Sequence, residues 1–423
     1  MKQATLMLCA IAGVASWGRA AELAHTTFQP EPIRIAISDL PKPFATQSAD
    51  NHPRVVPPPE GASLALPAGF RVSVFAEVPS ARWLALTPSG DVLCAASREN
   101  KVVLLKTAAD PTRAGGEQLF LDEAQGANLP FGMAFAGGYF YLGNTDAVLR
   151  YPYQKGEDSS GETFQLGDPE QITSLPGQGY NQHWTRNVVV SPDGQKLYVS
   201  VGSKTNASVE PLPRASVLRM NLDGSQRKVF ASGLRNPVGL DFHPQTKALY
   251  ATVNERDGLG DNLVPDYLAR LQEGEFYGWP YAYLTPERLD PRLNVAEAPR
   301  RRELAAKTET PEVLFQSHSA ALGLAFYDGD AFPEHYRDGA FVAFRGSWNR
   351  DRGTGYKIVF VPFERNGRPR GYYEDFVKGF LEKPSVPTTW GRPVGVLAMP
   401  DGSLLFTEEA NGRVYRVSFD QSG

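Results

Sequence analysis

The chain has 423 residues, of which 42% are hydrophobic and only 21% are charged. Such a composition can bury a sizeable core, so it excludes a wholly disordered protein. The formal net charge is −4 at pH 7 and the sequence contains no long basic block. A nucleic-acid partner is therefore not expected, because phosphate binding relies on clustered lysine and arginine.

Residues 1–20 have the pattern of a secretory signal peptide. Lys2 precedes an apolar run over residues 4–17, and small residues suited to cleavage follow at Gly18, Ala20 and Ala21. The alternative is a membrane anchor, but the run is short for a bilayer span. We therefore expect cleavage and a periplasmic or secreted mature protein. No later segment reaches about 18 uninterrupted apolar residues, so no membrane span is expected in the mature chain.

Residues 21–66 are rich in proline and include the run Pro57-Pro58-Pro59. Proline disfavours both regular helix and central strand, so this segment is predicted to be an extended lead-in. Isoleucines at positions 33, 35 and 37 offer apolar side chains for packing. The sequence leaves open whether the lead-in wraps the domain or extends away from it.

A repeated unit occupies residues 67–420. In each copy an apolar, β-rich run is followed by a turn and a second apolar run, and the clearest turns contain Pro-Asp-Gly, which closes a hairpin because proline presets φ. The clearest copies begin at Trp83, Trp184 and Val394, and the weaker ones begin at Leu129, Asn236 and Ala321. These six units predict an all-β chain folded as a six-bladed β-propeller. Their starts lie on the order of 45 to 85 residues apart, so several blades must carry inserted loops.

A parallel α/β fold is the rival architecture. It requires long stretches with a helical period of 3.6 residues. Such stretches are missing from the sequence, apart from candidates at residues 265–273 and 299–307. The propeller is therefore the favoured fold.

Local catalytic signatures are absent: the sequence has no Gly-rich phosphate loop, no Cys-rich zinc spacing and no His-Glu-x-x-His motif. Propellers instead gather loops from every blade around a central channel, where they can hold a cofactor. His183 lies in a polar, aromatic stretch just before the third repeat. A neutral imidazole there can take a proton from a substrate hydroxyl. The alternative for His183 is a packed or surface histidine.

Several motifs resemble those of one known family. The run His183-Trp-Thr-Arg-Asn, followed by Ser191-Pro-Asp-Gly and Val199-Ser-Val-Gly-Ser, is similar to the soluble quinoprotein glucose/sorbosone dehydrogenases, which are PQQ-dependent sugar dehydrogenases. Further similar stretches follow in order at residues 233–239, 254–261, 277–280, 345–350 and 390–395. The resemblance spans about residues 38–419 and is closest to the L-sorbosone dehydrogenase branch.

The resemblance implies that pyrroloquinoline quinone (PQQ) and Ca²⁺ bind at the channel mouth. His183 matches the family's base, which takes the substrate proton while hydride passes to the quinone carbonyl. The three carboxylates of PQQ suit the planar fork of arginine. The candidate cofactor-binding residues are Arg235, Asn236, Arg345, Trp348, Asn349, Arg392 and Lys204. Each arginine has the alternative role of a surface or blade-joining ion pair, and Trp348 and Asn349 have that of an ordinary packed turn.

The acidic loop at residues 255–261 aligns with the family segment whose backbone carbonyls hold calcium. A hard cation takes several oxygen ligands, and this loop offers both carbonyls and carboxylates. The candidate metal contacts are Glu255, Arg256 and Asp257. The residue pattern departs here from that of the glucose-oxidising members, and the alternative is a solvated acidic turn.

The sequence thus predicts PQQ- and calcium-dependent oxidation of a sugar or sugar aldehyde. The chain has no Cys-x-x-Cys-His haem signature, so electrons are expected to pass to an external cytochrome or quinone. One alternative is a calcium-dependent lactonase of the gluconolactonase type on the same fold. Another is a non-catalytic propeller that acts as a binding scaffold, since a fold does not determine a function.

Overall fold

The computed structural model describes residues 23–158, 161–177 and 183–420. Within this part of the chain almost all regular structure is β, and the one α-helix is α1 (Pro299–Ala305). The predicted all-β class is therefore confirmed. The predicted signal peptide, residues 1–20, lies outside the described residues. None of the helices in the described part has the length and apolar character needed to cross a bilayer.

Six antiparallel sheets carry most of the chain, and each is built on a path of four paired strands. The first sheet contains β5 (Ala81–Leu86), β6 (Val92–Ala96), β7 (Lys101–Lys106) and β8 (Gly116–Leu121), and the second contains β9 (Met133–Ala136), β10 (Tyr139–Gly143), β11 (Ala147–Asp158) and β13 (Glu170–Ser174), with β12 (Gly161–Leu166) paired to β11. The third contains β14 (Val188–Val190), β15 (Lys196–Val201), β16 (Ser216–Asn221) and β17 (Lys228–Ser232), and the fourth contains β18 (Asn236–Phe242), β19 (Leu249–Asn254), β20 (Tyr267–Leu271) and β23 (Val313–Leu314). The fifth contains β24 (Ala321–Phe326), β25 (Ala340–Phe344), β26 (Lys357–Val361) and β27 (Glu374–Val377), and the sixth contains β30 (Pro393–Ala398), β31 (Leu404–Glu408), β32 (Arg413–Phe419) and β4 (Phe70–Glu77).

Smaller elements lie outside these sheets. They are the parallel pair β1 (Ala24–Phe28) and β3 (Ser63–Pro67), the three-stranded sheet of β2 (Arg54–Val55), β29 (Thr388–Thr389) and β28 (Leu381–Lys383), and the hairpin of β21 (Ala282–Tyr283) and β22 (Thr285–Leu289). Short 3-10 turns occur at η1 (Ile37–Asp39), η2 (Ser97–Glu99), η3 (Glu123–Gln125), η4 (Val295–Glu297) and η5 (Glu334–Tyr336).

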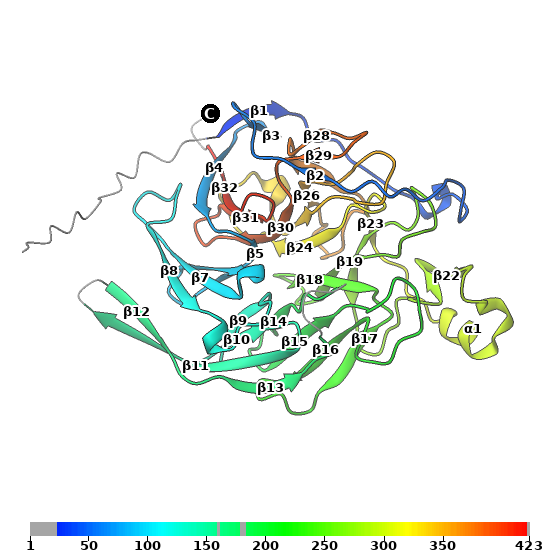
Figure 1. The fold of residues 1–423 in the computed structure, drawn as a ribbon, viewed down its shortest axis with the longest axis horizontal. Coiled ribbons are helices and arrows are strands. Elements are labelled where there is room, and N and C mark those ends of the chain that lie inside the picture. Colours follow the sequence, from blue (N-terminus) through cyan, green and yellow to red (C-terminus); the bar gives the residue numbers. More distant parts are fainter. Residues whose placement is uncertain (1–22, 159–160, 178–182, 421–423) are drawn as a thin grey trace, which may run out of the picture.

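The first strands of the six sheets form a closed ring. Strand β5 contacts β9, and the contacts continue from β9 to β14, β18, β24 and β30 and then back to β5. Figure 1 shows the sheets arranged around this ring, which is the architecture of a β-propeller. The sixth sheet is completed from the other end of the chain, because β4 pairs with β32 in a register that aligns Phe70 with Phe419.

The predicted repeats coincide with this ring. The repeats at Trp83, Asn236, Ala321 and Val394 begin within the first strand of a sheet, and those at Leu129 and Trp184 begin four residues before one. The alternating runs and their turns therefore mark where each sheet starts. Insertions follow as expected, and the largest lies between β20 and β23, where β22 and α1 stand out from the ring in Figure 1.

Of the two candidate helical stretches, only residues 299–307 are helical in part. The other, residues 265–273, contains strand β20, which pairs with β19 and carries the buried side chains of Tyr267 and Leu268. The helical expectation for that stretch is wrong because cross-strand pairing and burial override a short local period.

The lead-in wraps the propeller, which settles the question that the sequence left open. Leu64 and Leu66 on β3 are fully buried in a cluster with Phe70 of β4 and with Phe341 and Phe376 of the fifth sheet. The rings of Phe70 and Phe376 meet edge to face with centroids 5.0 Å apart. Further along the lead-in, Ile33 bridges to Tyr373. The lead-in is therefore part of the core.

Replacing Leu66 with Ala should destabilise the whole domain. The substitution removes buried methyl groups and leaves a cavity, which lowers the free energy of unfolding by about 2–5 kcal/mol. Urea unfolding followed by fluorescence measures this loss. The matched control is Val55→Ala in the same lead-in, where the side chain is 45% exposed and the change should stay within about 0.5 kcal/mol. Equal stability of the two variants would contradict a core role for the lead-in.

Candidate active site

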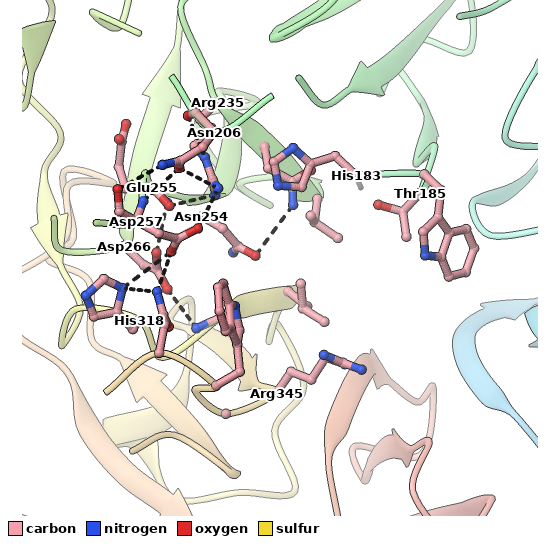
Figure 2. Close-up of a pocket in the computed structure, with 18 of the residues that line it drawn as sticks. His183, Thr185, Asn206, Arg235, Asn254, Glu255, Asp257, Asp266, His318 and Arg345 are labelled. Carbon is pink, nitrogen blue, oxygen red and sulfur yellow. Dashed lines mark hydrogen bonds and ion pairs between the residues drawn. The ribbon is translucent and has the colours of Figure 1, made fainter. Parts of the chain in front are cut away.

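A cavity of about 470 Å³ lies where the first strands of the sheets begin. Residues just before or at the start of β14, β18 and β24 line it, together with loops that follow β15, β19 and β25. The lining residues are Arg82, His183, Trp184, Thr185, Asn206, Arg235, Asn236, Val238, Asn254, Glu255, Asp257, Asp266, His318, Ala320, Leu322, Arg345, Gly346, Trp348 and Asn349. Figure 2 shows Glu255, Asp257 and Asp266 on one side of this cavity, with Arg345 away from them.

The cavity brings together most of the residues singled out in the sequence. Eight of the eleven line it, namely His183, Arg235, Asn236, Glu255, Asp257, Arg345, Trp348 and Asn349. They lie in or beside three neighbouring sheets, the third, fourth and fifth, so their proximity depends on how these sheets pack around the ring. Lys204, Arg256 and Arg392 are not among the lining residues.

His183 is held in a defined orientation. Its Nδ1 atom lies 2.8 Å from the backbone oxygen of Ser203, and a carbonyl can only accept, so Nδ1 carries the proton and donates it. Its backbone adopts a left-handed φ of 53°, and Arg186 donates a hydrogen bond to its carbonyl oxygen at 2.8 Å. A side chain at Gly202 would come within 2.6 Å of the Cβ of His183 and 2.4 Å of Oδ1 of Asn236. Glycine at 202 therefore makes room for both residues.

The imidazole of His183 is neutral. Burial, followed by the positive charge of Arg235, lowers the pKa of His183 well below its usual value. Because Nδ1 is protonated, the lone pair is on Nε2. The cavity thus contains a neutral imidazole that can accept a proton at Nε2, while Nδ1 is bonded to Ser203.

Arg235 joins two loops of the cavity wall. Its guanidinium donates to the side-chain oxygen of Asn206 at 3.0 Å, to the carbonyl oxygen of Glu255 at 2.7 Å and to Oδ2 of Asp257 at 2.8 Å. The sequence predicted Arg235 as a contact for a cofactor carboxylate. In this structure its fork is used by the protein's own oxygens.

Asp257 is held by side chains from several parts of the cavity wall. Besides Arg235, it accepts a hydrogen bond at Oδ1 from Asn349 at 2.6 Å, and Nδ1 of His318 lies 3.5 Å away. Burial alone would raise the pKa of Asp257, but Arg235, His318 and Asn349 hold it well below its usual range. Asp257 is therefore ionised. The Asn349–Asp257 bond joins the loop after β25 to the loop after β19.

Two residues of this wall were missed by sequence reasoning. His318 is 6% exposed and its Nε2 atom donates to the carbonyl oxygen of Gly260 at 3.0 Å. Asp266 accepts backbone hydrogen bonds from Glu255 at 2.9 Å and Ala320 at 2.7 Å, and burial raises its pKa to about 7. Neither residue lies in a motif, so the sequence offered no signal for them.

A cationic cluster forms another part of the wall. Arg82 and Arg345 both pair with the carboxylate of Glu409, whose side chain is 6% exposed. Burial would raise the pKa of Glu409, but Arg345, Arg82 and Arg392 lower it well below its usual range. One ionised carboxylate thus faces three guanidinium groups, which leaves the cluster positively charged. Arg82 and Glu409 were also missed, although Arg82 directly precedes the Trp83 repeat.

Arg392 supports this cluster by binding the backbone that carries Arg345. Its guanidinium donates to the carbonyl oxygens of Arg345 at 3.3 Å and Gly346 at 3.1 Å. Burial, followed by the charge of Arg345, lowers the pKa of Arg392 to about 9. Arg392 therefore holds the backbone on which Arg345 is mounted, and the structure does not bring it to the cavity wall as the sequence predicted.

Lys204 and Arg256 are also placed outside the lining. Lys204 is exposed, in the loop that contains Asn206. Arg256 is fully buried, and its guanidinium bonds to Glu255, Asp290 and two backbone carbonyls. A guanidinium has no acceptor atom, so only the backbone oxygen of Arg256 is chemically suited to a cation.

The cavity wall contains oxygen atoms that suit a hard cation. Oδ1 of Asn236 and Oε1 of Glu255 are buried without a hydrogen-bond partner among the described residues. Buried polar atoms are normally satisfied, so these two indicate a missing partner. The backbone oxygens of Glu255 and Asp257 are already used by Arg235, Asn206 and Arg292. Across the described ranges, no three His, Cys, Asp or Glu side chains converge closely enough to hold a metal by themselves.

Replacing Glu409 with Ala should weaken folding strongly. The substitution removes the buried carboxylate that pairs with the buried guanidinium of Arg82 and the partly buried guanidinium of Arg345, which lowers the free energy of unfolding by about 3–5 kcal/mol. The control is Asp420→Ala, which removes a surface pair with Arg71 and should cost about 0–1 kcal/mol. Urea unfolding of both variants measures the difference. If Glu409→Ala lost no more stability than the control, the arginine cluster would not depend on Glu409 as its buried counter-ion.

The sequence is similar to those of several known proteins. Residues 143–346 match the family model described as Glucose / Sorbosone dehydrogenase, and residues 294–420 match the model described as TrAA12-like. An uncharacterised protein of Borreliella burgdorferi is 34% identical over 249 residues, which are 58% of this chain and 63% of that protein. The aldose sugar dehydrogenase YliI of Escherichia coli is 29% identical over 111 residues, 26% of this chain and 27% of that enzyme. The chain thus spans less than two thirds of the length of either relative.

The fold is also found in solved structures. The holo form of the pyranose dehydrogenase PQQ domain from Coprinopsis cinerea superposes with a TM-score of 0.67 at 19% identity, over 87% of this chain and 99% of that one. At this identity the match concerns the fold. Together with the family model, which covers His183, Arg235, the 255–257 loop and Arg345, it confirms the resemblance to the glucose/sorbosone dehydrogenase family.

Proposed function

We propose that this chain oxidises a sugar or sugar aldehyde with PQQ and Ca²⁺ bound in the cavity. The observation that carries the proposal is the division of one cavity into a cationic cluster, a wall of acidic and amide oxygens, and a neutral imidazole. An anionic redox cofactor, a divalent cation and a substrate hydroxyl each have a matching partner in that arrangement. The family resemblance over residues 143–346 supports the same assignment.

We infer that the six sheets are six blades of one propeller. The closed contacts among β5, β9, β14, β18, β24 and β30 support this count. The pairing of β4 with β32, which completes the sixth sheet, also supports the count. We take residues 67–420 as the propeller domain and residues 21–66 as a lead-in that packs on it.

The cationic cluster is suited to the cofactor's carboxylates. Arg82 and Arg345 line the cavity and share Glu409, so their guanidinium groups retain positive charge toward an incoming anion. Arg392 orients Arg345 through its backbone. The amide of Asn349 and the indole of Trp348 also line the cavity, where both side chains are candidates for contact with the edge of the cofactor's planar ring. Lys204 stays a weaker candidate, because it lies outside the lining.

The oxygen-rich wall is suited to calcium. Oδ1 of Asn236 and Oε1 of Glu255, which have no hydrogen-bond partner in the part of the chain that the structure describes, are oxygens that a hard cation takes. Asp257, which is ionised and lines the same wall, adds negative charge. Arg256 would contribute through its backbone oxygen. When bound, PQQ supplies the two-electron acceptor and Ca²⁺ supplies a Lewis acid.

His183 acts as the base in this proposal. Burial and Arg235 keep its imidazole neutral, and Ser203 fixes the proton on Nδ1. The proton of the substrate hydroxyl therefore goes to Nε2. Electrons then leave to an external cytochrome or quinone, and the protein works in the periplasm or outside the cell. The motifs are most similar to those of the L-sorbosone dehydrogenase branch, and the proposed substrate class is a sugar or sugar aldehyde.

Reconstitution tests the proposal directly. Purified protein supplied with PQQ and Ca²⁺ should reduce an artificial dye in a sugar- or aldehyde-dependent manner, and omission of either component should abolish the reaction. The control is the same protein supplied with PQQ and a metal chelator, so that no Ca²⁺ is available. Hydrolysis of a lactone without quinone would instead favour the lactonase. Neither activity, across a panel of aldoses and aldehydes, would favour a binding scaffold.

His183→Ala should abolish turnover and leave PQQ binding intact. The substitution removes the base. Because general-base catalysis contributes about 10²- to 10⁴-fold to the rate, kcat should fall at least about 100-fold. Quinone absorbance titration measures binding and dye reduction measures turnover. Unchanged dye reduction in the variant would reject the assignment of His183.

A further inference from the structure

The lead-in crosses the loop that carries Trp348. The backbone N–H of Asn51 donates to the carbonyl oxygen of Trp348 at 2.8 Å. Its side-chain amide donates to the carbonyl oxygens of Arg350 at 3.2 Å and Asp351 at 2.9 Å. One asparagine, about 300 residues earlier in the chain, therefore donates to three backbone carbonyls of this loop.

The next residue of the lead-in, His52, stacks on the indole. The two ring centroids are 5.1 Å apart and the planes differ by 26°. Trp348 is 40% exposed and also lines the cavity. His52 thus covers one face of the indole, and the rest of the side chain retains exposed surface.

The same segment also forms hydrogen bonds with the loop that follows β19. Phe44 donates from its backbone to Leu259 at 2.8 Å, and the hydroxyl of Thr46 accepts from the backbone of Asp261 at 2.8 Å. The loop from residue 255 to residue 261 carries Asp257, which accepts a hydrogen bond from Asn349. Residues 44–52 therefore bind both loops that meet through the Asn349–Asp257 hydrogen bond.

We propose that Asn51 and His52 are positioning residues of the cavity, which fix the indole of Trp348 so that its uncovered face is presented to a sugar ring. The identity of the ligand rests on the proposed function, whereas the positioning itself does not. An exposed indole without a backing ring is free to sample several rotamers. A stacked partner restricts it, and the apolar face of a sugar then meets a surface that is already oriented.

The positioning role has a readout that needs no cofactor. Among the tryptophans in the described part of the chain, Trp348 alone is exposed, whereas Trp83, Trp184, Trp279 and Trp390 are all at most 7% exposed. Acrylamide quenching, with Trp348→Phe as the blank, therefore reports on this indole. Removal of the backing ring in His52→Ala should raise the quenching constant of Trp348, on the order of twofold since one ring face becomes uncovered. Asn51→Asp, which keeps the shape and loses the amide donor, should raise it as well.

Kinetics of the reconstituted protein test the consequence. His52→Ala should raise the KM for sugar roughly twofold to tenfold, the worth of an aromatic pair, with kcat nearly unchanged. His52→Phe should restore the lower KM because it restores a stacking ring. Ser48→Ala, an exposed position of the same segment, is the matched control and should match the wild type in both assays.

The outcomes separate the two proposals. If wild-type protein oxidises sugars while His52→Ala has unchanged quenching and unchanged KM, the positioning role is wrong and the proposed function stands. If no form oxidises any sugar but quenching rises in His52→Ala and Asn51→Asp and not in His52→Phe, the positioning role stands and the proposed function fails. An equal fall in kcat for His52→Ala and His52→Phe would overturn the positioning role, because it would indicate a requirement for imidazole chemistry.

Discussion

The pairing of β4 with β32 is the interaction on which the rest of this structure depends. It joins a strand that precedes the first sheet to the last strand of the sixth, and so fastens the beginning of the propeller to its end. Hydrogen bonds along this seam satisfy two strand edges that would otherwise be open. Because the cavity is lined by residues from several sheets, its geometry exists only when the ring is closed. Stability and site geometry therefore share one cause.

Buried charge is the second constraint, and it is met locally on each side of the cavity. Asp257 is compensated by Arg235, His318 and Asn349, whereas Glu409 is compensated by arginines that outnumber it. In a medium of low dielectric, unpaired charge is costly. The excess positive charge near Glu409 and the oxygens of Asn236 and Glu255, which have no hydrogen-bond partner within the described ranges, are thus two places in the cavity where the protein alone is incompletely satisfied. Both suit ligands of opposite charge, and their separation within one cavity gives an anionic cofactor and a cation distinct positions.

The lead-in connects these two properties. Its β3 residues, Leu64 and Leu66, are buried in the core, so the segment is anchored firmly at its end. Upstream of that anchor, residues 44–52 cross the loops that carry Asp257 and Trp348. A segment that looks like a proline-rich linker in the sequence is therefore continuous with both the core and the cavity rim. Proline suits this path, because an extended segment with few free dihedral angles loses little entropy when it is fixed.

Local patterns in the sequence determined the class of fold, the six repeat starts and His183, because alternation and Pro-Asp-Gly turns specify strands and hairpins through short-range physics. The motifs also identified Arg235, Asn236, Arg345 and Asn349 as cavity residues. Only the tertiary structure decided which charged groups meet: it made Arg256 a buried support and Arg392 a partly buried one, left Lys204 on the surface, and brought in Arg82, Asp266, His318 and Glu409. It also placed Asn51 and His52 against Trp348. These contacts join residues up to hundreds of positions apart, and their partners are set by closure of the ring, which no local pattern encodes.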